Sequence, residues 1–258
     1  MRSPGELPPS AAPLKPGERL DRLGLGRRVI IQRDDAFRFG IDAVLLAAFA
    51  RVPAEGEIVD LGAGNGAVPL LLADRTGARF TLVDIQPELL DMARRSAELN
   101  GLQDRFRFVL SDVREAADVL GADRFDYATS NPPYLRRGGG TPSPNATRHI
   151  ARHETTATID DFARAAARLL KPRGRAAWVY RPERLADLFS ALQRARLHPV
   201  RLRWVHPRPE ARAVLVLVEA VKGPAAPLAV EPPLFVATGD GYSEAMMAIY
   251  RMSGGADG

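Results

Sequence analysis

Four consecutive residues, Asn131-Pro132-Pro133-Tyr134, combine a side-chain amide, a rigid backbone and an aromatic ring. This combination suits the transfer of a methyl group to an amine on a planar ring. Such a nitrogen is a poor nucleophile because its lone pair is delocalised, so it must become pyramidal and positively charged to attack. Acceptors aimed at its two hydrogens favour that change, and the Asn131 side-chain carbonyl and the Pro132 main-chain carbonyl are suitable acceptors.

The two prolines restrict the backbone around these acceptors. Proline fixes its own φ and keeps the preceding residue extended, so the acceptors are preset before substrate arrives. Tyr134 can stack on a planar substrate, and no general base is required because the proton can leave after transfer. We therefore assign catalytic roles to Asn131, Pro132 and Tyr134. A proline turn that merely ends a strand is the alternative.

A glycine-rich loop, Asp60 to Gly66, reads DLGAGNG and stands between a strand-like run and a helix-like run. Glycines let the backbone turn sharply and approach a ligand closely. The spacing Gly-x-Gly-x-Gly differs from the Gly-x-Gly-x-x-Gly of pyrophosphate-binding folds. S-adenosylmethionine has no phosphate, and the acidic Asp60 suits its cationic amino and sulfonium groups. The alternative for the loop on its own is a tight turn in an α/β protein.

Two further acids follow the next two predicted strands. Asp84 is placed to accept hydrogen bonds from ribose hydroxyls, and Asp112 to accept from an adenine amine. Either could instead cap a helix, but the carboxyl ends of adjacent parallel strands meet at one ligand-binding edge. Together the motifs predict S-adenosyl-L-methionine as cofactor. We assign its site to Asp60, Gly62, Gly64, Asn65, Asp84, Asp112 and Asn131.

These motifs are spaced along an alternation of strand-like and helix-like segments, which is typical of a parallel sheet with helices on both faces. The strand-like runs are 57–61, 80–85, 106–110, 125–129, 176–180, 200–205 and 213–218. Only a short connection, Pro207-Arg208-Pro209-Glu210, lies between the last two, so they must be antiparallel. We predict an α/β fold of the Rossmann-like class I methyltransferase type: a seven-stranded, mostly parallel sheet closed by an antiparallel hairpin.

Three other segments of the sequence indicate a particular family of methyltransferases. Phe37 to Ala47 reads FRFGIDAVLLA, and Arg152-His153-Glu154 and Gly241-Tyr242-Ser243 stand further along the chain. With the motifs above, residues 18–252 resemble the bacterial tRNA adenine-N6 methyltransferases that modify an adenine next to the anticodon. The resemblance implies S-adenosylmethionine-dependent transfer to the exocyclic N6 amine of an adenine in tRNA.

The resemblance also extends the cofactor site. In that family the segment before the first strand lies over the cofactor, so Phe39 and Asp42 are expected to contact it. Asp42 could equally be a helix N-cap. One departure is Ala36-Phe37, where the family usually carries Gly-Tyr. This chain keeps the ring there but loses the hydroxyl.

The formal net charge is +5, and the excess is uneven. Residues 171–212 hold eleven Lys or Arg and three Asp or Glu. A clustered basic excess is expected of a protein that binds a phosphate-rich partner, although a solvated arginine-rich surface would look the same. With the resemblance, we expect RNA, specifically tRNA, as the partner, and phosphate contacts from Arg148 and Arg152.

The domain prediction is a single methyltransferase domain over residues 18–252. It has a core at about 55–220, a cofactor-covering segment at 18–54, a linker at 222–233 and a small strand and helix at 234–252. Residues 1–17 hold five prolines and no apolar run, so we expect a disordered leader; 253–258 are expected to be a loose tail.

Several classes of site are not expected. The chain has no cysteine, which excludes disulfides and thiolate metal sites. His149, His153 and Glu154 could suggest a metal site, but with no cysteine and no further ligand nearby we predict no metal centre. The longest apolar run, 43–50, is too short to span a bilayer, and a cytoplasmic protein is expected.

Three other functions share some of these features. A release-factor glutamine-N5 methyltransferase uses the same tetrapeptide, but usually carries a longer helical domain before the first strand than residues 18–54 offer. An rRNA guanine-N2 methyltransferase is often built with a duplicated second domain. The third alternative is a non-catalytic RNA-binding module, against which the intact Asn131 and glycine loop argue.

Overall fold

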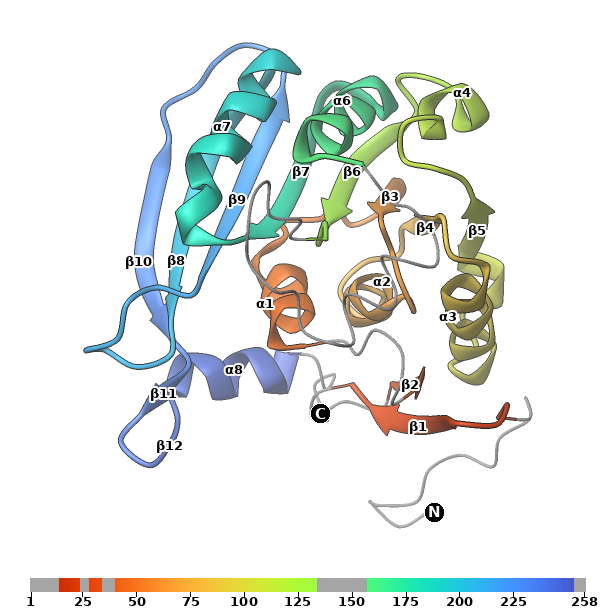
Figure 1. Ribbon diagram of the computed structural model, residues 1–258, viewed down its shortest axis with the longest axis horizontal. Coiled ribbons are helices and arrows are strands. Elements are labelled where there is room, and N and C mark those ends of the chain that lie inside the picture. The colour runs from red at the N-terminus through yellow and green to blue at the C-terminus, as the bar shows by residue number, and fades with distance from the viewer. Residues whose placement is uncertain (1–13, 24–27, 34–39, 134–156, 253–258) are drawn as a thin grey trace.

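The structure is a computed structural model and describes residues 14–23, 28–33, 40–133 and 157–252. Its centre is an eight-stranded sheet of order β10-β8-β9-β7-β6-β3-β4-β5 (Figure 1). The strands are β3 (Glu57–Leu61), β4 (Arg79–Asp84), β5 (Phe106–Leu110), β6 (Phe125–Ser130), β7 (Leu170–Tyr180), β8 (Leu197–His206), β9 (Leu215–Lys222) and β10 (Ala229–Phe235).

The strand directions follow the predicted plan. Strands β7, β6, β3, β4 and β5 are parallel, and β9 runs antiparallel to both β7 and β8. The class I methyltransferase arrangement, including the closing hairpin, is therefore confirmed.

One strand exceeds the predicted seven. Residues 229–235 pair in parallel with β8, whereas the sequence pattern had indicated a linker up to residue 233. Pro232 and Pro233 lie where the register shifts, between Glu231 and Leu234. Proline is tolerated here because β10 is an edge strand, whose outward N–H groups have no ladder partner. The proline content that suggested a linker is thus compatible with a strand.

A second difference concerns the start of β7. The sequence predicts a strand at 176–180, but β7 already begins at Leu170. Arg173 takes a positive φ of 66° within this stretch. The pairing with β6 shifts register between Phe125 and Tyr127 to accommodate it.

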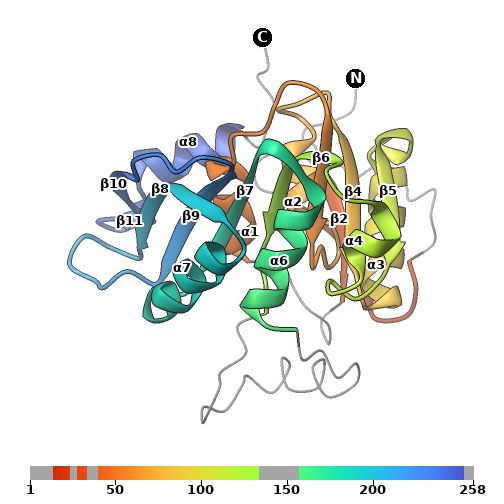
Figure 2. The same cartoon turned by 90° about the horizontal axis from the view of Figure 1, so that it is seen from above.

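Helices cover both faces of the sheet, as predicted. The helices are α1 (Ile41–Phe49), α2 (Ala67–Leu72), α3 (Pro87–Leu99), α4 (Ala116–Leu120), α6 (Ile159–Leu169), α7 (Leu185–Arg194) and α8 (Glu244–Met252). One apolar core contains buried side chains of α1, α2, α3 and α8, and the other those of α4, α6 and α7. Figure 2 shows α7 and α8 on opposite sides of the strands.

Local signals place several helix ends. Pro87 opens α3 at its first turn, and Asn100 with the left-handed Gly101 (φ 67°) closes it. At the start of α6, the Asp161 carboxylate accepts from the Thr158 backbone N–H at 2.8 Å. This is one half of a capping box.

Short elements complete the fold. A hairpin of β1 (Glu18–Arg22) and β2 (Val29–Arg33) lies beside α3, and β11 (Ala237–Thr238) pairs with β12 (Gly241–Tyr242). Two 3-10 turns cover Gln103–Arg105 and Pro182–Arg184. The hairpin is held by a largely buried ion pair, in which Arg95 of α3 donates to Glu18 at 2.6 Å. This fixes the N-terminal segment next to the glycine loop.

Candidate active site

The predicted motifs converge at the point where the strand order reverses. Strand β3 lies between β4 and β6, so successive connections leave it toward opposite edges of the sheet. Open α/β sheets bind ligands in the crevice at the carboxyl ends of such strands. Asp60, Asp84 and Asn131 stand at or directly after the carboxyl ends of β3, β4 and β6.

The glycine loop needs its glycines. Gly62, Gly64 and Gly66 all have positive φ, at 71°, 56° and 82°. A Cβ on Gly62 would lie 3.2 Å from Cε1 of Phe162 on α6, closer than ordinary contact. The loop is tied to β4, because Gly62 and Ala63 donate to the Val83 carbonyl at 2.9 and 3.0 Å. It therefore presents a tight, fixed backbone.

Asp84 fastens the same loop from the other side. Its Oδ2 accepts from the Gly64 N–H at 2.8 Å, and its Oδ1 from the Gln86 N–H at 2.9 Å. Asn65 is 1% exposed and donates its Nδ2 to the Ile31 carbonyl of β2 at 3.2 Å. Among the described residues, the buried Asn65 Oδ1 has no hydrogen-bond partner. A buried acceptor of this kind suits a donor supplied by a ligand.

Asp60 is a buried acid with an unusual pKa. It is 3% exposed, and burial raises its pKa from 3.8 to about 7, with the charge of Asp84 adding to the rise. The Thr129 hydroxyl donates to it at 2.6 Å and opposes the rise. Sequence reasoning missed Thr129, although the register of β3 with β6 places it opposite Asp60. A cation near this carboxyl would stabilise its charged form.

Asp112 is engaged within its own turn. Its Oδ1 accepts from the Arg114 backbone N–H at 2.9 Å, and its Oδ2 from the Arg114 guanidinium at 2.6 Å. The Arg114 guanidinium is the main reason that the Asp112 pKa is lowered. A contact from Asp112 to an adenine amine would therefore share the carboxylate with Arg114.

The tetrapeptide is joined to helix α1. Asn131 donates its Nδ2 to Oδ2 of Asp42 at 3.0 Å, and Oδ1 of Asp42 accepts from the Ala43 N–H at 2.9 Å. Because both carboxylate oxygens accept, the NH₂ end of the Asn131 amide must face Asp42. The acceptor end, Oδ1, is therefore the end directed elsewhere.

Asp42 is not a helix N-cap, because the N-cap of α1 is Gly40 and Asp42 lies inside the first turn. A contact between Asp42 and the cofactor stays a prediction. Of the remaining tetrapeptide, Pro132 is buried and Pro133 exposed.

Four predicted site residues, Phe39, Tyr134, Arg148 and Arg152, lie outside the described residues, as do His149, His153 and Glu154. In the described part of the chain, no group of three His, Asp or Glu side chains could hold a metal ion. Within the same residues, no helix is long and apolar enough to cross a membrane.

Comparison with known proteins gives a consistent result. Residues 40–194 match the family described as the methyltransferase small domain. A tRNA1(Val) (adenine(37)-N6)-methyltransferase from Porphyromonas gingivalis W83 is 34% identical over 197 residues, covering 74% of this chain and 76% of that protein.

Two further similarities are informative. A release factor glutamine methyltransferase from Chlorobaculum tepidum is 39% identical over 118 residues, covering 42% of this chain and 38% of that protein. A crystal structure of a predicted O-methyltransferase, Atu636 from Agrobacterium tumefaciens, superimposes with a TM-score of 0.67 at 26% identity, covering 83% of this chain and 98% of that one. The similarity to the glutamine enzyme is thus confined to less than half of either protein.

Proposed function

Because this chain belongs to the methyltransferase small domain family and to the tRNA1(Val) (adenine(37)-N6)-methyltransferases within it, we propose that it methylates N6 of an adenine next to the anticodon of a tRNA. It is an S-adenosylmethionine-dependent N-methyltransferase. The single observation that carries transfer to an amine is the Asn131 amide, whose NH₂ end is held by Asp42; the choice of adenine in tRNA rests on the extent of similarity to the relatives.

The described residues fit S-adenosylmethionine. The buried Asn65 Oδ1 offers an unsatisfied acceptor, and Asp60 offers a carboxyl whose charged form a cation would favour. Asp84, fixed to the Gly64 N–H, is suited to ribose hydroxyls at the end of β4. When bound, the cofactor supplies an electrophilic methyl group on a sulfonium.

The chain's own contribution to the chemistry is acceptor placement. Asp42 holds the NH₂ of Asn131, so Oδ1 of Asn131 accepts a hydrogen of the substrate amine. This hydrogen bond strengthens as the amine nitrogen gains positive charge. The Pro132 carbonyl is the proposed second acceptor. Neither group takes the proton; they favour the pyramidal nitrogen that attacks.

Adenine in tRNA is favoured over glutamine in a release factor by the extent of similarity. The tRNA-modifying relative matches over about three quarters of both proteins, whereas the glutamine enzyme matches over 42% of this chain. Since tRNA is the proposed substrate, the cytoplasm is the proposed compartment.

The basic stretch 171–212 contributes less positive surface than its composition suggests. Glu219, fully buried, forms ion pairs with Arg175 at 3.1 Å and with the largely buried Arg201 at 3.4 Å. Lys171 pairs with Asp126 at 2.7 Å. RNA contacts from this stretch are therefore expected from Arg208 and Arg212, which are exposed and follow the carboxyl end of β8, and from the two arginines considered in the next subsection.

The proposal is tested by offering purified protein two substrates, unmodified tRNA and a release factor, with methyl-labelled cofactor. We expect label in the tRNA and none in the protein. Asn131→Ala serves as the control, with transfer reduced about a hundredfold or more and cofactor affinity retained. Label in the release factor alone would contradict the proposal.

A further inference from the structure

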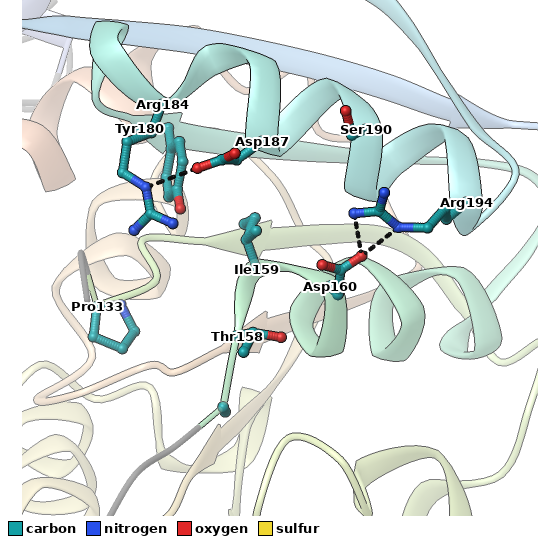
Figure 3. A pocket seen from close by; sticks show the side chains of 10 residues that line it. Pro133, Thr158, Ile159, Asp160, Tyr180, Arg184, Asp187, Ser190 and Arg194 are labelled. Atoms are coloured by element: carbon teal, nitrogen blue, oxygen red, sulfur yellow. Dashed lines mark hydrogen bonds and ion pairs between the residues drawn. The ribbon is translucent and has the colours of Figure 1, made fainter. Parts of the chain in front are cut away.

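A groove of about 270 Å³ adjoins the candidate active site. One end is formed by Pro133, two residues after Asn131, and the walls by the start of α6 and the inner side of α7 (Figure 3). The charged side chains that border the groove favour a nucleic-acid strand as its occupant.

Two arginines border the groove. Arg184 lies with its guanidinium carbon 5.7 Å from the centroid of the Tyr180 ring, and its side chain is only 21% exposed. Its Nε donates to Asp187 at 3.0 Å, while its terminal nitrogens point into the groove (Figure 3). The guanidinium is thus held in place by both an aromatic ring and a carboxylate.

Arg194 occupies the far end. Its Nε and Nη2 donate to the same oxygen of Asp160, at 2.7 and 2.6 Å. Arg194 is 62% exposed and Asp160 36% exposed, so water screens the pair and little is lost when it is exchanged for another anion. A phosphate suits the guanidinium better than one carboxylate oxygen does, because it offers several acceptors to the planar fork.

We propose that this groove binds the nucleotide adjacent to the target adenine, with phosphates of the RNA strand held by Arg184 at one end of α7 and by Arg194 at the other. Asp160 and Asp187 then act as counter-ions that hold the arginines in position and are displaced by phosphate. The proposal rests on RNA as the substrate, and deepens it by naming where the strand runs after it leaves the active site: from Pro133 along α6 and α7.

The assignment predicts that substitutions of Arg194 and of Asp160, which form one ion pair, change the KM for tRNA in opposite directions. Arg194→Gln removes a phosphate contact and is expected to raise the KM for tRNA about threefold to tenfold, with kcat and cofactor affinity retained. It also lowers the slope of log affinity against log salt by about 1. Asp160→Asn releases Arg194 and removes a repelling charge, so KM is expected to fall about twofold to threefold. A merely structural pair would show the same sign for both variants.

The chain provides a matched control on α6, the helix that carries Asp160. Arg168, in the last turn of α6, pairs with Asp118 at 2.5 Å and is 48% exposed, but neither residue lines the groove. Arg168→Gln and Asp118→Asn make the same charge changes and are expected to leave KM for tRNA within about twofold of wild type. Arg184→Gln is a second groove variant, and its thermal midpoint shows whether the contact with Tyr180 also supports folding.

The possible outcomes separate the two proposals. Normal tRNA methylation by wild type, with Arg194→Gln indistinguishable from Arg168→Gln, overturns the groove assignment alone. An increase of KM in Asp160→Asn as large as that in Arg194→Gln overturns it too, because the pair is then structural. Failure of the wild type to methylate any tRNA, with methylation of a release factor, overturns the proposed function and the groove assignment with it.

Discussion

The contact between Asn131 and Asp42 gives a prediction that can be worked through donor by donor. Asp42 accepts with both oxygens, from the Ala43 N–H at 2.9 Å and from the Asn131 Nδ2 at 3.0 Å. Asp42→Asn leaves one oxygen and one NH₂, so the new amide can accept from only one of the two donors. If its oxygen stays on the Ala43 N–H, its NH₂ faces Asn131, and the Asn131 amide must turn over.

The cost follows from that inversion. A hydrogen bond to a charged group contributes about 1.5–3 kcal/mol, which corresponds to roughly tenfold to 150-fold in an equilibrium. We therefore expect Asp42→Asn to lower kcat about tenfold to a hundredfold. This loss in kcat reports the orientation of Asn131, whereas any weaker binding of S-adenosylhomocysteine would report the cofactor contact expected of Asp42.

The reciprocal exchange provides the control. Asn131→Asp keeps an acceptor but sets two carboxylates about 3 Å apart, replacing a donor–acceptor contact with repulsion. In the double variant, the amide at position 42 accepts from the Ala43 N–H and donates its NH₂ to the carboxylate at position 131. Every group is then satisfied again, and the other oxygen of that carboxylate can accept from substrate.

Single-turnover rates of the four proteins form a double-mutant cycle. A double variant at least tenfold faster than Asn131→Asp supports the account, and losses that simply add refute it.

Two other predictions concern the cofactor site. The pKa of Asp60 is raised from 3.8 to about 7 in the folded protein, so the folded state retains a proton that the unfolded state has released, and stability falls as pH rises between these values. Asp60→Asn should therefore raise the free energy of unfolding of the cofactor-free protein at pH 8 by up to about 4 kcal/mol, and with it the thermal midpoint, but change little at pH 4. The same variant should weaken cofactor binding. An equal shift of the midpoint at both pH values would contradict the assignment. Gly62→Ala combines a φ of 71° with a Cβ 3.2 Å from Phe162, so it should cost about 1–2 kcal/mol and lower the midpoint by several degrees; calorimetry without cofactor checks this, and an unchanged midpoint would show that the loop tolerates a side chain.

Much of the site could be predicted because its residues follow strands whose ends are visible in the sequence. Asp60, Asp84 and Asn131 each terminate a short apolar run, and a parallel sheet brings such ends to one edge. The glycine loop is equally local, since its left-handed residues succeed one another within five positions.

What escaped prediction depends on contacts between distant parts of the chain. Asp42 and Asn131 are 89 residues apart, and nothing near either of them indicates the hydrogen bond that orients the amide. Likewise, Arg201 counted as part of a basic surface, but it is largely buried and pairs with Glu219 and with Glu231 of β10. Strand β10 was not predicted because its prolines suggested a linker. The pairing of an edge strand depends on which strand lies beside it, and the local sequence does not indicate that.

The central claim is the chemical identity of the methylated group, and nucleoside mass spectrometry tests it most directly. Purified protein is incubated with unmodified tRNA and S-adenosylmethionine, and the RNA is digested to nucleosides. The same reaction is run on a transcript whose adenine next to the anticodon is replaced by guanine. We predict N6-methyladenosine from the first transcript and none from the second. Methylated guanosine, or a tRNA without any added methyl group under conditions where the protein binds its cofactor, would contradict the account.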